Sequence, residues 1–224
     1  MNKTISCLLL ACCVVFSPIY GDQPLLNKAT FTPAQKSQNP EESFMFEGKV
    51  SYFMPSSSQV SNIYHNGWLN YQVSATYLFP IGLGKEHKIG VFSSLNYLHS
   101  RGESLGGDYS TRIRILPLTL GLRYLYAFYF DDIELDVYGN LGARYNWINI
   151  RNHCPYVETS VNPNCFGGVA ELGAIAAFAK YFLINVFMDY SVANTSSSVS
   201  KPFVYKQTLS ISGFSIGGGL GVRF

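Results

Sequence analysis

The last eleven residues of the chain alternate strictly between two kinds of side chain. Every second position from 214 to 224 is apolar or glycine, and the last of these is Phe224. The positions between them hold only Ser215, three glycines and Arg223. Since a period of two places alternate side chains on opposite faces of a strand, this segment is predicted to be a β-strand with one apolar face.

Seven earlier segments show the same alternation. They cover residues 44–54, 69–79, 89–97, 116–124, 133–147, 170–178 and 184–190. Long polar connections follow every second strand, at 56–66, 100–111, 151–166 and 192–207, whereas the others are short. Long outer loops that alternate with short periplasmic turns are typical of bacterial membrane barrels. The pattern therefore predicts an all-β fold, an eight-stranded antiparallel transmembrane up-and-down β-barrel over residues 43–224, with both termini in the periplasm.

A soluble lipocalin-like barrel is the main alternative, and it would turn its apolar faces inward. Composition favours the membrane barrel, because 16 Tyr, 16 Phe and 20 Gly accompany only 13% charged residues. Aromatic residues also gather near the ends of the apolar faces, as the interfacial girdles of barrels require. These are Phe44, Tyr77, Phe79, Tyr97, Tyr124, Tyr145, Trp147, Phe178, Tyr190 and Phe224. The net charge of +2 gives no electrostatic footprint for nucleic acid.

The amino-terminal segment has the layout of a secretory signal. Lys3 precedes an apolar run over residues 5–16, and Pro18 and Gly21 then break the pattern. Such a run is too short to span a membrane as a helix, so residues 1–21 are predicted to be a signal peptide. Lipoprotein processing at Cys12 is an alternative. Residues 22–42 are predicted to be a flexible periplasmic leader, and the mature chain is expected in the bacterial outer membrane.

Charged side chains on the polar faces are predicted to fill the lumen. They are Glu47, Lys49, Arg123, Glu134, Asp136, Arg144, Glu171 and Asp189. Eight strands enclose a space just wide enough for side chains, so these charges should form a packed ion-pair network. Glu134, Asp136 and Glu171 are the predicted partners of Arg144. A narrow polar conduit, or a carboxylate site, is the alternative.

Two cysteines remain after removal of the signal peptide, and both lie in the third long connection. On an exported chain, Cys154 and Cys165 are predicted to form a disulfide bond. His153 beside them would give only three zinc ligands, which is a poor set, so neither a metal nor another cofactor is expected.

A pair of residues at the outer rim offers an enzymatic alternative. Some small outer-membrane barrels modify lipids or cleave proteins, and His99 with Ser100 at the outer rim is the candidate pair. The glycine-rich run 217–221 is not a nucleotide loop, because no helix follows it.

The closing Val-Arg-Phe and the alternation through residues 42–224 resemble the small opacity/adhesion-type outer-membrane barrels. The stretch EGKVSYFMPSS at 47–57, with Ile63-Tyr64 and Gly67-Trp68, also looks like uncharacterised barrels of chlamydia-like bacteria. The resemblance implies that the barrel assembly machinery reads Phe224, and it transfers no catalytic residue.

The expected function is accordingly a non-enzymatic outer-membrane barrel surrounded by lipid, whose four loops contact the exterior or a host ligand. A passive channel for small or hydrophobic solutes is the first alternative, and a lipid-modifying enzyme is the second.

Overall fold

The computed structural model describes residues 43–80, 86–103, 109–130, 133–153, 160–178, 181–199 and 205–224, with the backbone alone at 80, 196–199 and 205–208. The predicted signal peptide and leader lie outside these residues. No helix in the described part of the chain is long and apolar enough to cross a membrane.

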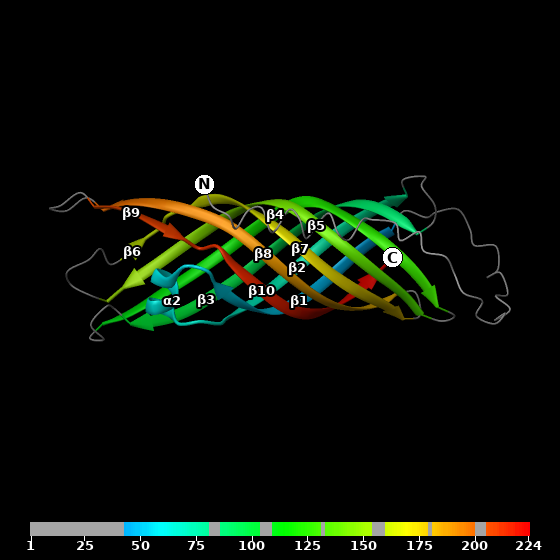
Figure 1. The fold of residues 1–224 in the computed structure, drawn as a ribbon, viewed down its shortest axis with the longest axis horizontal. Helices are drawn as coiled ribbons and strands as arrows, with labels where there is room; N and C mark the ends of the chain where they lie inside the picture. Colours follow the sequence, from blue (N-terminus) through cyan, green and yellow to red (C-terminus); the bar gives the residue numbers. More distant parts are fainter. Residues whose placement is uncertain are drawn as a thin grey trace, which may run out of the picture. The chain divides into compact units, whose positions relative to one another are not determined.

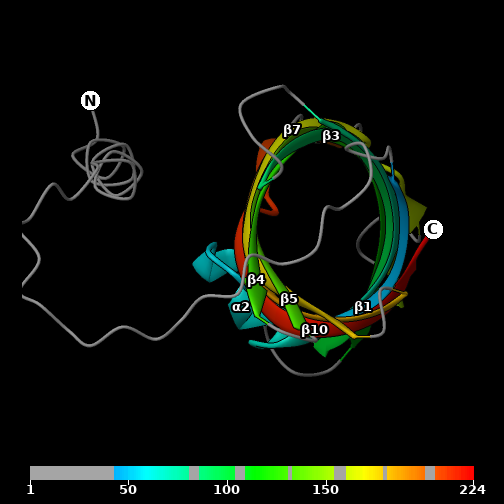
Figure 2. The same ribbon diagram turned by 90° about the vertical axis from the view of Figure 1, so that its right-hand side faces the viewer.

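Eight antiparallel strands form one closed ring (Figures 1 and 2). They are β1 (Ser43–Pro55), β2 (Trp68–Pro80), β3 (His87–Glu103), β4 (Ser110–Phe130), β5 (Ile133–Asn152), β7 (Cys165–Phe178), β8 (Phe182–Val199) and β10 (Gly213–Arg223). Each strand pairs with its neighbour in sequence order, and β10 pairs with both β8 and β1. The predicted eight-stranded barrel is confirmed.

Closure depends on the pairing of the first and last strands. The register of β1 with β10 runs from Met45 opposite Arg223 to Pro55 opposite Gly213. Beyond it, the amide nitrogen of Phe44 lies 3.0 Å from the carbonyl oxygen of Phe224, and the reverse bond measures 2.9 Å. A closed ring leaves no edge strand in lipid, where an unbonded backbone group would be costly.

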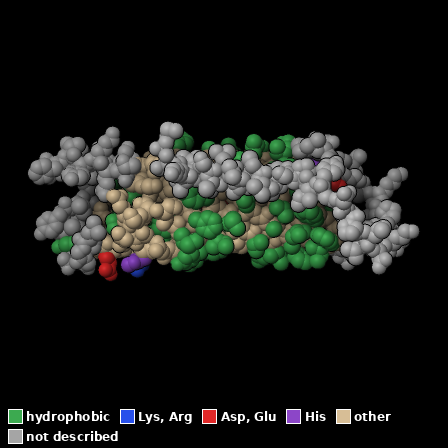
Figure 3. Space-filling model, in the orientation of Figure 1, with side chains coloured by type: hydrophobic (Ala, Val, Ile, Leu, Met, Phe, Trp, Pro, Cys, Tyr) green, Lys and Arg blue, Asp and Glu red, His purple; other side chains and the backbone are tan. Residues whose placement is uncertain are grey.

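Side chains alternate between the two faces of the wall as the period of two requires. On β1, Glu47, Lys49 and Ser51 are buried inside the ring, whereas Val50 and Tyr52 are about half exposed outside it. Apolar side chains cover the middle of the outer surface in Figure 3. This inverted distribution, apolar outside and charged inside, excludes the soluble lipocalin-like alternative, because a soluble barrel buries its apolar face.

Three further elements lie at the end of the barrel away from the carboxyl terminus, and we call this end the α2 end (Figure 1). They are the helix α2 (Ser58–Tyr64) and the short strands β6 (Ser160–Val161) and β9 (Tyr205–Ser210). The end where β1 begins and β10 finishes is called the terminal end. β6 pairs with β5, and β9 extends β8 as a hairpin.

These elements correct three of the predicted loops. The first connection, 56–66, contains α2, and the fourth, 192–207, is mostly the β8–β9 hairpin. The third, 151–166, contains β6 and the first residues of β7, so Cys165 lies on a strand and not in a loop. Helix α2 turns Val60 and Tyr64, four residues apart, onto one buried face. The hairpin escaped prediction because most of its residues are Asn, Ser, Thr, Lys or Gln, which leaves too few apolar residues for a regular alternation.

Candidate functional site: the lumen and its two mouths

The centre of the lumen holds a compact group of four charged side chains. Nζ of Lys49 lies 2.9 Å from Oε1 of Glu171, and Nη1 of Arg123 lies 2.9 Å from Oε2 of Glu47. Lys49 is also 3.8 Å from Glu47, which joins the two pairs into one chain. Two positive and two negative charges cancel, and all four side chains are almost completely buried.

Neutral side chains supply further hydrogen bonds to this central group, and Nη2 of Arg123 is the atom left without a partner among the described residues. Asn140 accepts a bond of 2.9 Å from Nε of Arg123 and donates one of 3.0 Å to Glu171. The hydroxyl of Tyr138 donates to Glu171 at 2.8 Å, and its ring lies 4.5 Å from Cζ of Arg123. Asn185 donates to Oε1 of Glu47. A buried charge is tolerable when its remaining lone pairs and protons are used in this way.

Glycines on β10 make room for the stems of these side chains. A Cβ at Gly219 would lie 2.7 Å from Cγ of Lys49 and 2.6 Å from the carbonyl oxygen of Gly48. Gly217 and Gly221 have equally close contacts with β1. The inward face of β10 is therefore bare where β1 carries its longest side chains.

A second ionic group closes the terminal end of the lumen. Nη2 and Nη1 of Arg223 lie 2.6 and 3.0 Å from the two carboxylate oxygens of Glu134, and Nη1 lies 3.2 Å from Asp136. Lys88 lies 3.5 Å from Glu134. The predicted pairing of Glu134 and Asp136 with Arg144 is therefore wrong. Arg223 pairs with Glu134 and Asp136 because closure of the barrel places the end of β10 at the same level of the lumen as the start of β5.

Arg144 lies nearer the α2 end, without an ionic partner in bonding distance among the described residues. Its Nε donates to Thr119 at 3.0 Å. Asp189 accepts a bond of 3.3 Å from Ser215, while its other carboxylate oxygen has no partner in the described residues. Beside Arg144 lies a cavity of about 20 Å³, also lined by Asn70, Asn146 and Ser191. That volume holds about one water molecule, so the lumen is not an open path at this level.

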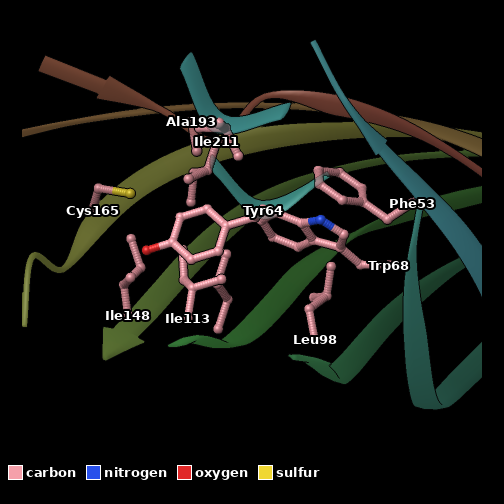
Figure 4. Packing of buried hydrophobic residues seen from close by; sticks show 11 residues of the cluster. Phe53, Tyr64, Trp68, Leu98, Ile113, Ile148, Cys165, Ala193 and Ile211 are labelled. Atoms are coloured by element: carbon pink, nitrogen blue, oxygen red, sulfur yellow. The ribbon is translucent and has the colours of Figure 1, made fainter. Parts of the chain in front are cut away.

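Apolar side chains block the lumen on both sides of the ionic centre. The terminal-end cluster is formed by Met45, Leu78, Leu125, Ala127, Tyr138, Ile175, Ala177, Leu183 and Phe187. The α2-end cluster is formed by Phe53, Val60, Tyr64, Trp68, Leu98, Ile113, Ile115, Ile148, Cys165, Ala193 and Ile211 (Figure 4). The lumen is thus filled in five layers. From the terminal end they are the ionic group of Arg223, the terminal-end cluster, the central ionic group, the polar layer around Arg144 and the α2-end cluster.

Helix α2 contributes Tyr64, a large aromatic residue, to the α2-end cluster. The ring of Tyr64 lies edge-on to Trp68, with centroids 5.9 Å apart, and its hydroxyl is 3.1 Å from that of Thr111 (Figure 4). Trp68 in turn packs against Phe53 at 5.5 Å. Sequence reasoning missed this contribution, although the spacing of Val60 and Tyr64 was a usable signal.

The candidate catalytic pair is not assembled. His99 and Ser100 are consecutive strand residues and therefore point to opposite faces. The Ser100 hydroxyl donates to the carbonyl oxygen of Tyr64 at 3.0 Å, towards the interior. Partial burial and, next, the charges of neighbouring arginines hold the pKa of His99 below its usual value. Among the described residues, no three His, Cys, Asp or Glu side chains gather as a metal site.

Three predicted residues remain: Phe224, Cys154 and Cys165. Phe224 follows the last residue of β10 and is 74% exposed on the outer face, and its recognition by an assembly machinery stays a prediction. Cys154 lies outside the described residues, so the disulfide bond also stays a prediction. Cys165 is buried in the α2-end cluster, with its sulfur 3.8 Å from Nδ2 of Asn146.

No protein-family model and no curated protein matches the chain. Solved structures do. The outer membrane protein OprG of Pseudomonas aeruginosa has a TM-score of 0.53 at 16% identity, covering 81% of this chain and 95% of that one. Outer membrane protein W of Escherichia coli has a TM-score of 0.50 at 13% identity, covering 81% and 97%. The chain therefore has the fold of the small bacterial outer-membrane barrels.

Proposed function

We propose that this protein is a non-enzymatic barrel of the bacterial outer membrane that presents surface hairpins outside the cell. The observation that carries the proposal is the filled lumen. Its central and terminal ionic groups are paired, its two apolar clusters span the interior, and the cavity beside Arg144 has room for about one water molecule. A solute of useful size has no path, so function is expected on the outside of the barrel.

The α2 end supplies that outer surface. Strands β3, β4, β5 and β8 continue towards the α2 end beyond the band of exposed apolar side chains, which we call the apolar belt. Strand β8 then forms a hairpin with β9 (Figure 1). Segments on a rigid scaffold are where binding normally resides. In the proposed orientation the terminal end of the barrel faces the periplasm and these segments face the exterior, with a host or environmental surface as the proposed partner.

Conductance separates this function from the channel alternative. The folded protein, checked by its shifted migration on an unheated gel, is expected to give no stable current steps in a planar lipid bilayer. Regular steps from the folded fraction would contradict the proposal in favour of a channel.

Replacement of residues 196–208 by a two-residue Asn-Gly turn tests the surface role, because Thr195 and Leu209 on either side of the turn already face each other. Because β9 pairs only with β8, the barrel should still fold. Attachment of cells carrying the shortened protein to a host-cell monolayer should fall relative to cells with the full chain. Equal attachment at equal surface levels would count against a role for this hairpin.

A further inference from the structure

Three arginines stand in a row across the outer face of β3, β4 and β5. Arg112 of β4 lies directly opposite Arg101 of β3 on one side and Arg151 of β5 on the other. Neighbouring strands are about 4.8 Å apart. Like charges placed directly opposite each other destabilise a sheet, so this row requires a compensating negative charge.

A fourth arginine widens the row into a patch. Arg114 lies two residues from Arg112 on the same face of β4 and pairs with His99 on β3. The lowered pKa of His99 has the nearness of Arg112, Arg114 and Arg101 among its causes, after partial burial. We call Arg101, Arg112, Arg114 and Arg151 the arginine patch.

Within the described residues, no acid forms an ion pair with the arginine patch. Glu103 lies on the same face, two positions beyond Arg101 on β3, so the described patch has four cations and one neighbouring acid. The other Lys and Arg side chains that the structure describes point into the lumen. They are Lys49, Lys88, Arg123, Arg144 and Arg223. The outward cations of the described wall are thus concentrated on three adjacent strands.

The patch lies immediately beyond the apolar belt. The exposed residues Tyr97, Leu116 and Trp147 lie on the same outward faces and are 43%, 39% and 41% exposed. Two residues further towards the α2 end, the same strands carry His99, Arg114 and Asn149, respectively. Tyr and Trp typically mark the boundary between hydrocarbon and headgroups. In Figure 3, a small area of Lys or Arg colour appears near the left-hand end, beside His colour and close to Asp or Glu colour.

We propose that the arginine patch binds the phosphate groups of an outer-leaflet lipid headgroup. The planar guanidinium forms paired, charge-assisted hydrogen bonds to phosphate oxygens. Three side chains in a row span about 10 Å at the usual strand spacing, enough for more than one phosphate. The patch faces sideways at the level of the headgroups, which favours a lipid over a soluble polyanion approaching the loops. This inference goes beyond the surface role and does not depend on any host partner.

The test compares the full-length protein with two triple variants, Arg101→Gln/Arg112→Gln/Arg151→Gln and the matched Lys variant at the same positions. Each is folded into phosphatidylcholine vesicles with and without lipid A, and thermal unfolding and lipid retained after detergent extraction are measured. Inorganic phosphate and heparin are added separately to phosphatidylcholine samples.

Lipid A should raise the unfolding midpoint of the natural protein and be retained at least about tenfold more than by the Gln variant, since charge-assisted contacts are lost. The Lys variant should fall between them. In phosphatidylcholine alone, the Gln variant should unfold no earlier than the natural protein, because repulsion is relieved. A Gln variant with unreduced retention, or an equal midpoint shift from phosphate or heparin, would overturn the lipid assignment. So would a Gln variant that unfolds earlier in both membranes.

Discussion

Arg223, the penultimate residue, binds Glu134 at the start of β5 across the terminal mouth of the lumen. The two side chains are 89 positions apart in sequence and form a two-bond contact, with distances of 3.0 and 2.6 Å. The contact fastens the last strand to the opposite part of the ring as well as to its neighbours. It exists only once the barrel has closed.

Removal of Arg223 should therefore weaken the folded barrel. Arg223→Ala leaves Glu134 and the buried Asp136 without their guanidinium, and removal of one partner of a buried pair costs about 3–5 kcal/mol. Arg223→Lys should recover part of this loss. Urea unfolding in lipid vesicles measures it, and an unchanged midpoint in Arg223→Ala would mean that water compensates these acids.

Two arginines of the lumen should differ in their contribution to stability. Arg123 binds Glu47 and Asn140 directly, whereas Arg144 binds the neutral Thr119 and no acid among the described residues. Arg123→Met strands the carboxylate of Glu47 and should cost about 3–5 kcal/mol. Arg144→Met should cost clearly less. Unfolding free energies of both variants under one condition decide this, and equal costs would show that Arg144 has a stronger partner than Thr119.

The bare face of β10 can be probed with two glycines. Gly219→Ala puts a methyl group against Lys49 and the backbone of β1, and overpacking of this kind typically costs about 1–3 kcal/mol. Gly48→Ala is the matched control, because a Cβ there has no atom within 4 Å. The control should be neutral or slightly stabilising. Equal effects of the two changes on the unfolding midpoint would refute the steric role of Gly219.

Loss of the terminal aromatic side chain should slow assembly more than it lowers stability. The backbone bonds between Phe224 and Phe44 survive in Phe224→Ala, while the exposed ring does not. Deletion of Phe224 removes those bonds as well. The fraction of heat-modifiable protein in outer membranes should fall in both variants and further in the deletion. Normal levels of folded protein in Phe224→Ala would argue against a recognition role for the ring.

The predicted disulfide bond gives a direct chemical readout. If Cys154 and Cys165 are joined, mass spectrometry after alkylation without reductant finds neither thiol modified. Reduction of the bond is expected to loosen the connection between β5 and β7 and to leave the two strands paired, because Cys165 is only the first residue of β7 in a register that runs on to Phe178. Ready alkylation of Cys154 in protein from native membranes would exclude the bond.

Much of the fold follows from local sequence. A period of two decides which face each strand residue takes, so the inward position of Glu47 and the outward position of Tyr52 were predictable. Apolar alternation also located all eight strands of the ring. The short polar elements were not accessible in this way, because α2 has only seven residues and most residues of the β8–β9 hairpin are polar.

The partners within the lumen could not be read from the sequence. Which side chains meet across a barrel depends on the stagger between strands, which is a property of the closed ring. Facing alone favoured Arg144 as the partner of Glu134, and the stagger brought Arg223 there instead. The charges of the lumen were predictable as a set, whereas their pairing was not.

The hairpin formed by β8 and β9 has a consequence for how this protein can change over generations. From Asn194 onwards, β8 is paired with β9, which has no second neighbour in the described sheet. Substitutions or length changes there disturb one strand pair and leave the lumen and the ring intact. Among related bacteria, this ribbon is expected to diverge fastest and to tolerate inserted epitopes, while the barrel beneath it stays nearly constant.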